Sequence, residues 1–225
     1  EMSLKYFARY SSFSRGVPGI FLGYSTGTAR QEDKIVMTGF SFDKKISDKI
    51  FSKSDLTYQY QHQKYYDPAT FNLTTVINSF YKLRRITVSS AYSFLPSDQF
   101  NIESGMELNL DDISSNDTEE GKATQAAVFA VSKYVLNISN GSVLTFYPSA
   151  RYDYFSNISE HNVITGKFGI NFKPFGKTDL HVKSSFGNNF SAPTFNELYW
   201  KDIGNKDLRH EKSLSFDVGL YYKFN

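Results

Sequence analysis

Residues Ser213 to Phe224, near the end of the chain, alternate between apolar and polar side chains for twelve positions. A period of two over that length predicts a β-strand with one apolar face and one polar face. The segment before it, starting at Gly187, is rich in Asn, Asp, Gly, Pro and aromatic residues. It is too long and too polar for a tight turn, so it predicts a large loop attached to the strand. The apolar positions are Leu214, Phe216, Val218, Leu220, Tyr222 and Phe224.

The same alternation recurs along the whole chain, in about ten segments. Each is near the length with which a tilted strand crosses an outer membrane. One face of each segment is lipid-like and the other carries charge, which predicts an all-β, antiparallel transmembrane β-barrel wall of about ten meandering strands. The segments are Met2 to Phe13, Lys34 to Phe42, Asp55 to Tyr66, Tyr81 to Leu95, Gln99 to Leu110, Thr124 to Leu136, Val143 to Phe155, Val163 to Phe172, Thr178 to Phe190 and Ser213 to Phe224.

The links between these segments alternate in length. Outer-membrane barrels have short periplasmic turns and long extracellular loops, whereas soluble sandwiches need not sort loop lengths to one end. Tyr and Phe also cluster near the strand ends, as aromatic girdles at two membrane interfaces require. The short links are Asp43 to Lys49, Pro96 to Asp98, Ser139 to Gly141 and Pro174 to Lys177; the long ones are Ser14 to Asp33, Asp67 to Leu73, Asp111 to Lys122, Ser156 to Asn162 and Ser191 to Glu211.

Composition removes several other classes of protein. No run approaches 18 apolar residues, so a transmembrane helix is not expected. The chain has no Cys, which excludes disulfide frameworks and thiolate metal sites. A net charge of +2 gives no reason to expect a nucleic-acid partner. The chain opens at Glu1 in strand-like sequence without a signal peptide, which suggests a piece of a longer exported protein.

Two neighbouring motifs carry a family resemblance. The run GNNFSAPTFNELYW (Gly187 to Trp200) is followed by GNKDLRHE (Gly204 to Glu211). Together they resemble the barrel of TonB-dependent outer-membrane receptors, in which Phe-x-Ala-Pro-Thr ends a strand, Glu-Leu-Tyr follows in the loop and Gly-Asn-x-x-Leu-x-x-Glu opens the next strand. Arg209-His210 stands where the family usually has a basic residue and Pro. The matching residues are Phe190, Ala192, Pro193, Thr194, Glu197, Leu198, Tyr199, Gly204, Asn205, Leu208 and Glu211.

Earlier segments agree with the resemblance, and they follow in the family's order. They are SRGVPG (Ser14 to Gly19), ARQEDK (Ala29 to Lys34), YDPA (Tyr66 to Ala69) and Arg151 to Asp153 after Pro148. The resemblance implies a barrel of 22 strands with a globular plug. Residues 1–225 are therefore expected to be part of such a barrel, with the plug domain and the closing strands absent, because open sheet edges are not tolerated in lipid. The alternative is a small complete barrel closed between the first and last of the ten strands.

The resemblance also implies a function. The expected protein lies in the bacterial outer membrane, contacts the lipid bilayer and is a monomeric barrel when complete. It binds a scarce large nutrient (a metal–siderophore, haem, cobalamin or glycan) outside and imports it with energy from the TonB complex, which acts through the plug. A passive outer-membrane pore or adhesin barrel is the alternative function. A soluble carbohydrate-binding β-sandwich is a third hypothesis.

The sequence predicts no enzyme, cofactor or metal site. The four His residues are far apart, and no His-x-x-x-His, paired-carboxylate or Gly-x-Ser-x-Gly pattern is present. Charged residues on the polar faces are expected to form ion pairs in the lumen or to dock a plug; these are Arg151, Asp153, Glu103 and Glu107. The acidic link with Asp111, Asp112, Asp117, Glu119 and Glu120 either holds calcium through oxygen ligands or is solvated surface charge.

Loop residues that meet a ligand from outside are the remaining candidates. Aromatic and Arg side chains bind chelates or glycans by stacking and cation–π contact. Tyr199 and Trp200 have an alternative role, as loop anchors or as members of the upper aromatic girdle. The predicted ligand-binding residues are Asn196, Tyr199, Trp200, Arg209, Tyr65, Tyr66 and Arg15.

Overall fold

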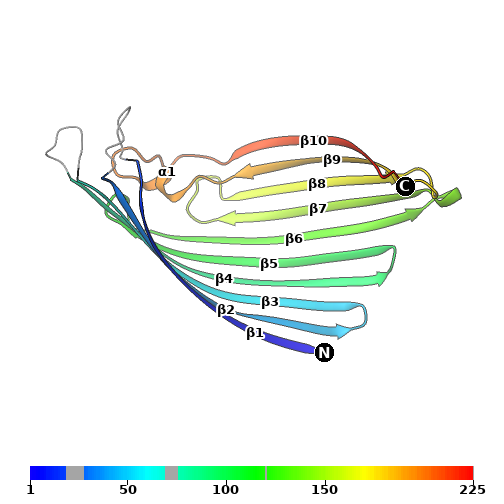
Figure 1. Ribbon diagram of the computed structural model, residues 1–225, viewed down its shortest axis with the longest axis horizontal. Coiled ribbons are helices and arrows are strands. Elements are labelled where there is room, and N and C mark those ends of the chain that lie inside the picture. The colour runs from blue at the N-terminus through cyan, green and yellow to red at the C-terminus, as the bar shows by residue number, and fades with distance from the viewer. Residues whose placement is uncertain (19–27, 69–75, 120, 225) are drawn as a thin grey trace.

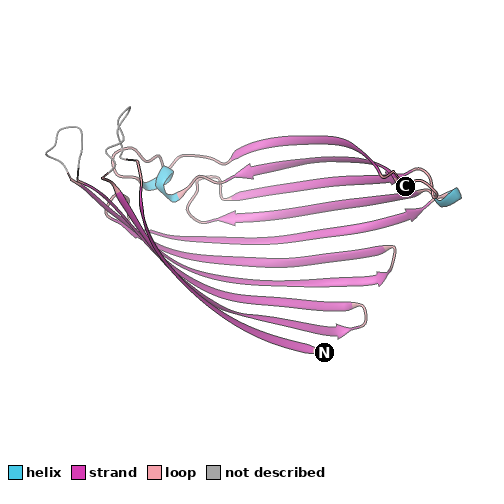
Figure 2. Ribbon diagram, viewed as in Figure 1, coloured by secondary structure: helices cyan, strands magenta, loops and turns pink. Residues whose placement is uncertain are grey.

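A computed structural model describes residues 1–18, 28–68, 76–119 and 121–224. These residues form one sheet of ten strands in chain order, each antiparallel to its neighbours (Figures 1 and 2). The predicted all-β meander of ten strands is confirmed. The strands are β1 (Met2–Gly16), β2 (Arg30–Ser47), β3 (Ile50–Asp67), β4 (Ile77–Ser97), β5 (Phe100–Ser115), β6 (Gly121–Asn137), β7 (Val143–Phe155), β8 (Asn162–Lys173), β9 (Leu180–Ser191) and β10 (Glu211–Tyr222).

In the described parts of the links there are two short helical segments. A 3₁₀ turn, η1 (Ser139–Gly141), joins β6 to β7, and α1 (Phe195–Tyr199) lies in the link between β9 and β10. Among the described residues, no helix has the length and apolarity needed to cross a membrane. The long links gather at one end of the sheet, and both chain termini lie at the end with the short turns (Figure 1).

The strand register separates the residues into two faces. Directly opposed residues in an antiparallel pair point to the same side. Along the main part of every strand, the two residues of each cross-strand pair have numbers that are both even or both odd. Even-numbered residues therefore share one face of the sheet and odd-numbered residues share the other. Phe40, Leu56, Val88 and Leu108 form a typical row on the even face. The even face is apolar and is called the outer face below. The odd face is called the inner face.

The outer face is not covered by a second protein layer in the described part of the chain. Leu214 and Phe216 on β10 are 74% and 68% exposed. Asp153 on the inner face is fully buried instead. An apolar face this extensive is stable only against hydrocarbon, and a soluble β-sandwich would have packed it against a second sheet. The hypothesis of a soluble sandwich is therefore wrong.

Seven of the ten strands, β1 to β6 and β8, are longer than the sequence predicted, so several link boundaries are wrong. β4 has 21 residues, which gives a length of about 70 Å, more than twice the hydrocarbon thickness. The predicted acidic link begins inside β5. Tyr65 and Tyr66 lie within β3, in agreement with the predicted segment Asp55 to Tyr66, although they were grouped with the loop residues as ligand-binding candidates. Cross-strand hydrogen bonds and ion pairs extend the strands beyond the apolar band, where their polar sequence resembles a loop. Glu120 and parts of the predicted links 14–33 and 67–73 lie outside the described residues.

The described strands do not close on themselves. β1 pairs with β2 and β10 pairs with β9, and within the described ranges these two strands form the opposite edges of the sheet. The alternative of a ten-strand barrel closed between its first and last strands is therefore wrong.

Candidate ligand-binding site

The link between β9 and β10 packs onto the ends of neighbouring strands. Leu198 in α1 is 1% exposed and joins Phe155, Ile158 and Val163 in a small apolar cluster. His210 at the end of the link lies between two aromatic rings, with centroid distances of 5.0 Å to Phe155 and 5.3 Å to Phe190. The link is therefore a packed layer over the sheet end, not a free loop. Phe190, Ala192, Tyr199 and Leu208 complete the packing.

The turn of α1 is held by reciprocal caps. The Thr194 hydroxyl accepts a hydrogen bond from the Glu197 amide (3.3 Å), and the Glu197 carboxylate accepts one from the Thr194 amide (2.6 Å). This capping box satisfies amide groups at the start of the helix, which have no partner inside it. The sequence Thr-Phe-Asn-Glu thus explains why a turn of helix forms at this point.

Backbone hydrogen bonds then tie the same link to residues 116–119, between β5 and β6. Trp200 forms an isolated bridge with Thr118. The Glu119 amide donates to the Tyr199 carbonyl (3.1 Å). Lys206 forms an ion pair with Glu119 at 2.7 Å, and its ammonium lies 5.6 Å from the Tyr199 ring centroid. These contacts hold α1 and Trp200 above the inner face.

A groove of about 560 Å³ lies between this link and the inner face of β2 to β5. Its volume is in the range typical of small-molecule sites. Amide, hydroxyl and aromatic side chains form its walls, and none of its described lining residues is Lys, Arg or His. The lining residues are Gln31, Gln61, Gln63, Tyr65, Ile77, Ser79, Phe80, Tyr81, Ser115, Asp117, Thr118, Thr194, Phe195, Asn196 and Trp200.

Two of the groove amides are oriented by one buried carboxylate. Asp33 is 3% exposed and accepts hydrogen bonds from the side-chain nitrogens of Gln31 (2.8 Å) and Gln63 (2.9 Å). Since each amide uses its nitrogen on Asp33, its carbonyl oxygen remains to accept a bond from elsewhere. This wall of the groove therefore suits a ligand that brings N–H or O–H donors.

The structure brings together three of the predicted ligand-binding residues, Asn196, Trp200 and Tyr65, in this groove. Tyr199 is a loop anchor, because its hydroxyl donates to the Asn157 carbonyl (3.2 Å) and its ring lies 4.5 Å from that of Phe195.

Three others are not among the groove residues. Arg209 is exposed, and Arg15 lies in β1 with its guanidinium 5.8 Å from the Phe13 ring. Tyr66 has the parity of the outer face.

The groove glutamines were missed as candidates. Gln61 and Gln63 are spaced by two on β3, so they share a face, and that spacing was the available signal. Nothing in the sequence around Gln31 indicates that it lines the groove, because its position there depends on the pairing of β2 with β3.

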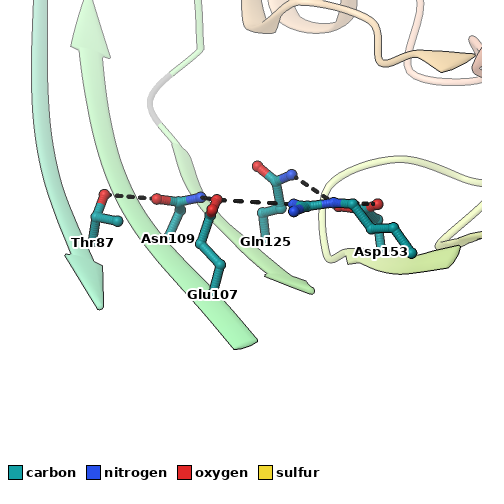
Figure 3. A network of polar contacts seen from close by, with 6 residues as sticks. Thr87, Glu107, Asn109, Gln125 and Asp153 are labelled. Atoms are coloured by element: carbon teal, nitrogen blue, oxygen red, sulfur yellow. Dashed lines mark hydrogen bonds and ion pairs between the residues drawn. The ribbon is translucent and has the colours of Figure 1, made fainter. Parts of the chain in front are cut away.

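A polar network, none of whose residues lines the groove, crosses the inner face of β4 to β7 (Figure 3). The Arg151 Nε lies 3.0 Å from both carboxylate oxygens of Asp153, and its Nη2 lies 4.0 Å from Glu107. Asn109 donates to Glu107 (2.8 Å) and accepts from Thr87 (2.7 Å). The predicted inner-face charges thus share one face.

Glu103, the fourth predicted inner-face charge, stands apart from the network and accepts a bond from Ser93 (2.9 Å). Whether these charges dock a plug stays a prediction.

The acidic link does not form a metal cage in the described residues. Asp111 makes a two-pronged ion pair with Arg85 (2.6 and 2.7 Å), and Asp112 pairs with Arg84 at 3.2 Å. Both lie in β5, on opposite faces, because their numbers differ in parity. Among residues 1–18, 28–68, 76–119 and 121–224, no group of three or more His, Cys, Asp or Glu side chains is arranged to hold a metal ion.

The capping box predicts that the stability of the α1 turn depends on pH. The backbone N–H of Thr194, and then its hydroxyl, lower the pKa of the Glu197 carboxyl below its ordinary value. The stabilisation is therefore complete above the ordinary carboxyl pKa and is lost as the pH falls through the lowered value. We expect amide hydrogen exchange at Glu197 and Leu198, corrected for intrinsic rates, to accelerate as the pH is lowered below the ordinary carboxyl pKa.

The matched variant for this prediction is Glu197→Gln, which keeps an acceptor but cannot titrate. Its exchange should be faster than wild type at neutral pH and should change less with pH. An identical pH dependence in the two proteins would show that another group controls the docking of α1.

A single curved antiparallel sheet with an uncovered apolar outer face, a polar inner face and links sorted by length defines the wall of an outer-membrane β-barrel. The family model described as "TonB dependent receptor-like, beta-barrel" matches residues 3–225. The chain therefore belongs to the TonB-dependent receptor family, and its place is the bacterial outer membrane.

Curated relatives match parts of the chain. The vitamin B12 transporter BtuB of Photobacterium profundum is 29% identical over 126 residues, which are 55% of this chain and 19% of that protein. The vitamin B12 transporter BtuB of Vibrio vulnificus is 36% identical over 87 residues, 39% of this chain and 14% of that protein. The matches thus span less than a fifth of either relative.

Solved structures show the same fold. A mutant of the ferric enterobactin receptor PfeA from Pseudomonas aeruginosa superposes with a TM-score of 0.73 at 14% identity, over 100% of this chain and 38% of that one. The siderophore receptor PirA from Acinetobacter baumannii gives 0.69 at 14% identity, over 99% of this chain and 39% of that one. At this identity the likeness concerns the fold alone.

Proposed function

We propose that this chain is part of the wall of a receptor that binds a large, scarce nutrient outside the cell. The receptor imports it through the outer membrane with energy supplied by TonB through a plug domain. The observation that carries the proposal is the groove between the packed β9–β10 link and the inner face of β2 to β5. A passive pore has no need for a groove lined by oriented polar and aromatic side chains at its outer end.

The two free sheet edges support the view that residues 1–225 are a partial barrel. Unpaired backbone N–H and C=O groups at β1 and β10 would each cost several kcal/mol in hydrocarbon, on the order of a lost buried hydrogen bond. Further strands of a larger barrel would pair these groups. A plug would then occupy the polar inner face, where Arg151 and Glu107 lie.

Within this function we propose that the substrate is a cobalamin. Both curated relatives are named vitamin B12 transporters. A corrin ring carries carboxamide side chains, whose N–H groups match the carbonyl oxygens of Gln31 and Gln63. Trp200, which is 44% exposed, and Tyr65 offer apolar ring faces for its large planar ring.

The charge of the groove supports the same substrate. Anionic iron chelates and haem propionates are bound best by Arg and Lys, through charge-assisted hydrogen bonds. The described groove residues include no such cation, and Asp117 adds negative charge. A neutral or weakly charged ligand therefore fits this site better than a polyanionic chelate.

The test is binding and uptake of labelled cyanocobalamin by cells that produce the full-length protein. Trp200→Ala is expected to weaken cobalamin binding by about tenfold, about 1.4 kcal/mol, because it removes a large apolar contact. Ile203→Ala is the matched control, since Ile203 is a 75% exposed apolar residue in the same link that does not line the groove. It should change binding less than about twofold.

The outcomes separate the parts of the proposal. Uptake that is lost without TonB, but shows no preference for cobalamin, would reject the substrate and retain the transport function. Flux of small solutes that is unselective and independent of TonB would favour the passive pore instead. Retention of bound ligand without import would favour an adhesin.

A further inference from the structure

Basic side chains gather on the outer face of β2 to β4, toward the end where the long links lie. Lys34 on β2 is directly opposite His62 on β3, which is directly opposite Lys82 on β4. Lys64 and Arg84 follow two positions away on β3 and β4, with the same parity and therefore on the same face. These five residues are called the outer basic patch. They belong to the surface that faces lipid, not to the ligand groove.

The patch carries more positive charge than its surroundings neutralise. Arg84 is paired with Asp112, but Lys34, Lys64 and Lys82 form no ion pair within 4.0 Å among the described residues. In the described strands, Glu32 is directly opposite Lys64 on the same face, so Glu32 and Asp112 are the carboxylates beside the four basic side chains Lys34, Lys64, Lys82 and Arg84. Four basic side chains beside two carboxylates leave a net positive charge on this part of the outer face, which favours the binding of an anion.

The apolar band places the patch at one membrane interface. On β2 the outward-facing residues between Lys34 and Lys44 carry no charge. A tilted strand crosses the hydrocarbon with about 9–11 residues, so these two lysines mark its two boundaries. Below the patch on β3, Tyr60 and Tyr58 face outward, as interfacial tyrosines do. Since the long links lie on the outside of the cell, the patch lies at the level of the outer-leaflet headgroups.

We propose that the outer basic patch binds the phosphate groups of a phosphorylated glycolipid of the outer leaflet. The lysine ammonium groups reach the phosphates sideways, while the acyl chains of the same lipid cover the apolar row of Phe40, Leu56 and Val88 below. Lipid phosphate is favoured over a soluble anion because the patch adjoins this uncovered apolar surface and faces away from the groove. The bound lipid would form part of the first lipid shell around the barrel.

The test compares full-length receptors purified from outer membranes in mild detergent, with bound lipopolysaccharide counted by native mass spectrometry. The triple variant Lys34→Gln, Lys64→Gln, Lys82→Gln is expected to retain at least about tenfold less lipid, since each cation near a phosphorylated surface contributes to binding. The single variant Lys82→Gln, with an expected loss of about fivefold, serves if the triple variant folds poorly. The control is Lys53→Gln, Lys167→Gln, Lys183→Gln, which makes the same charge change on the inner face.

Several outcomes would overturn the proposal. The inner-face control should retain lipid within about twofold of wild type. Equal loss of lipid in both triple variants would point to net charge and not to the patch. Equal retention of lipid A from which the phosphates have been removed would show that acyl chains alone hold it. Displacement of the lipid by millimolar inorganic phosphate would identify a soluble-anion site instead.

Discussion

Replacement of Val88 by arginine is expected to lower the free energy of unfolding of the barrel by about 2–4 kcal/mol. The same replacement at the next residue, Ser89→Arg, is expected to lower it by less than about 1 kcal/mol. Val88 lies on the outer face in a row with Leu56 and Leu108, near the middle of the apolar band. An arginine there must leave water for hydrocarbon. Ser89 lies on the inner face, opposite both Asp55 and Glu107, so an arginine at this position meets two carboxylates.

The measurement is urea-induced unfolding of the full-length protein in lipid vesicles, followed by the electrophoretic shift between folded and unfolded barrel. The two variants share the strand, the depth and the inserted side chain, and they differ only in the face. A cost at Ser89→Arg equal to that at Val88→Arg would contradict the assignment of even-numbered residues to lipid.

Removal of the Asp153 carboxylate is expected to cost about 2–3 kcal/mol. Asp153 is fully buried and is the main partner of Arg151, whose Nε and Nη2 lie about 3 Å from it. In Asp153→Ala the guanidinium would be left with Glu107 at 4.0 Å. The expected cost is below that of a fully buried pair, because the Arg151 side chain is 32% exposed and water still reaches it.

The double variant Arg151→Met, Asp153→Ala distinguishes an unpaired charge from lost packing. Since the unpaired guanidinium causes most of the cost, the double variant should be more stable than Asp153→Ala alone. Asp217→Ala is the control, because Asp217 is an exposed inner-face carboxylate that accepts a bond from Ser185. Its expected effect is within about 0.5 kcal/mol. The same unfolding measurement applies, and a double variant as unstable as Asp153→Ala, or less stable than it, would contradict the ion-pair explanation.

Much of the barrel wall could be predicted from the local alternation of apolar and polar side chains. The period of two assigned Leu214, Phe216 and Val218 to one face without knowledge of any neighbour, and the structure leaves all three exposed there. β7 begins and ends at the predicted residues, Val143 and Phe155. β1 to β6 and β8 extend beyond their predicted ends, because their polar ends are supported by partners across the sheet. Arg85 and Asp111, for example, are 26 positions apart, and local pattern could not show that they pair.

The candidate site followed from the sequence only in part. Asn196 and Trp200 were found through a loop motif, and Tyr65 through its place near a strand end. Their meeting in one groove with Gln31 and Gln63 depends on the register of β2 and β3 and on the bridge from Trp200 to Thr118. Tyr66, by contrast, lies on the opposite face from Tyr65, and the period of two within β3 is enough to show this.

The alternation of side chains by itself determined that this chain forms strands with one face for lipid and one for polar groups, because a strand directs successive side chains to opposite sides. Only the tertiary structure decided which residues meet across the sheet, how far each strand runs and how the long link packs onto its neighbours. Those choices depend on contacts between residues far apart in the chain, such as Leu198 with Phe155, and the free energy of such contacts is not encoded in any single segment.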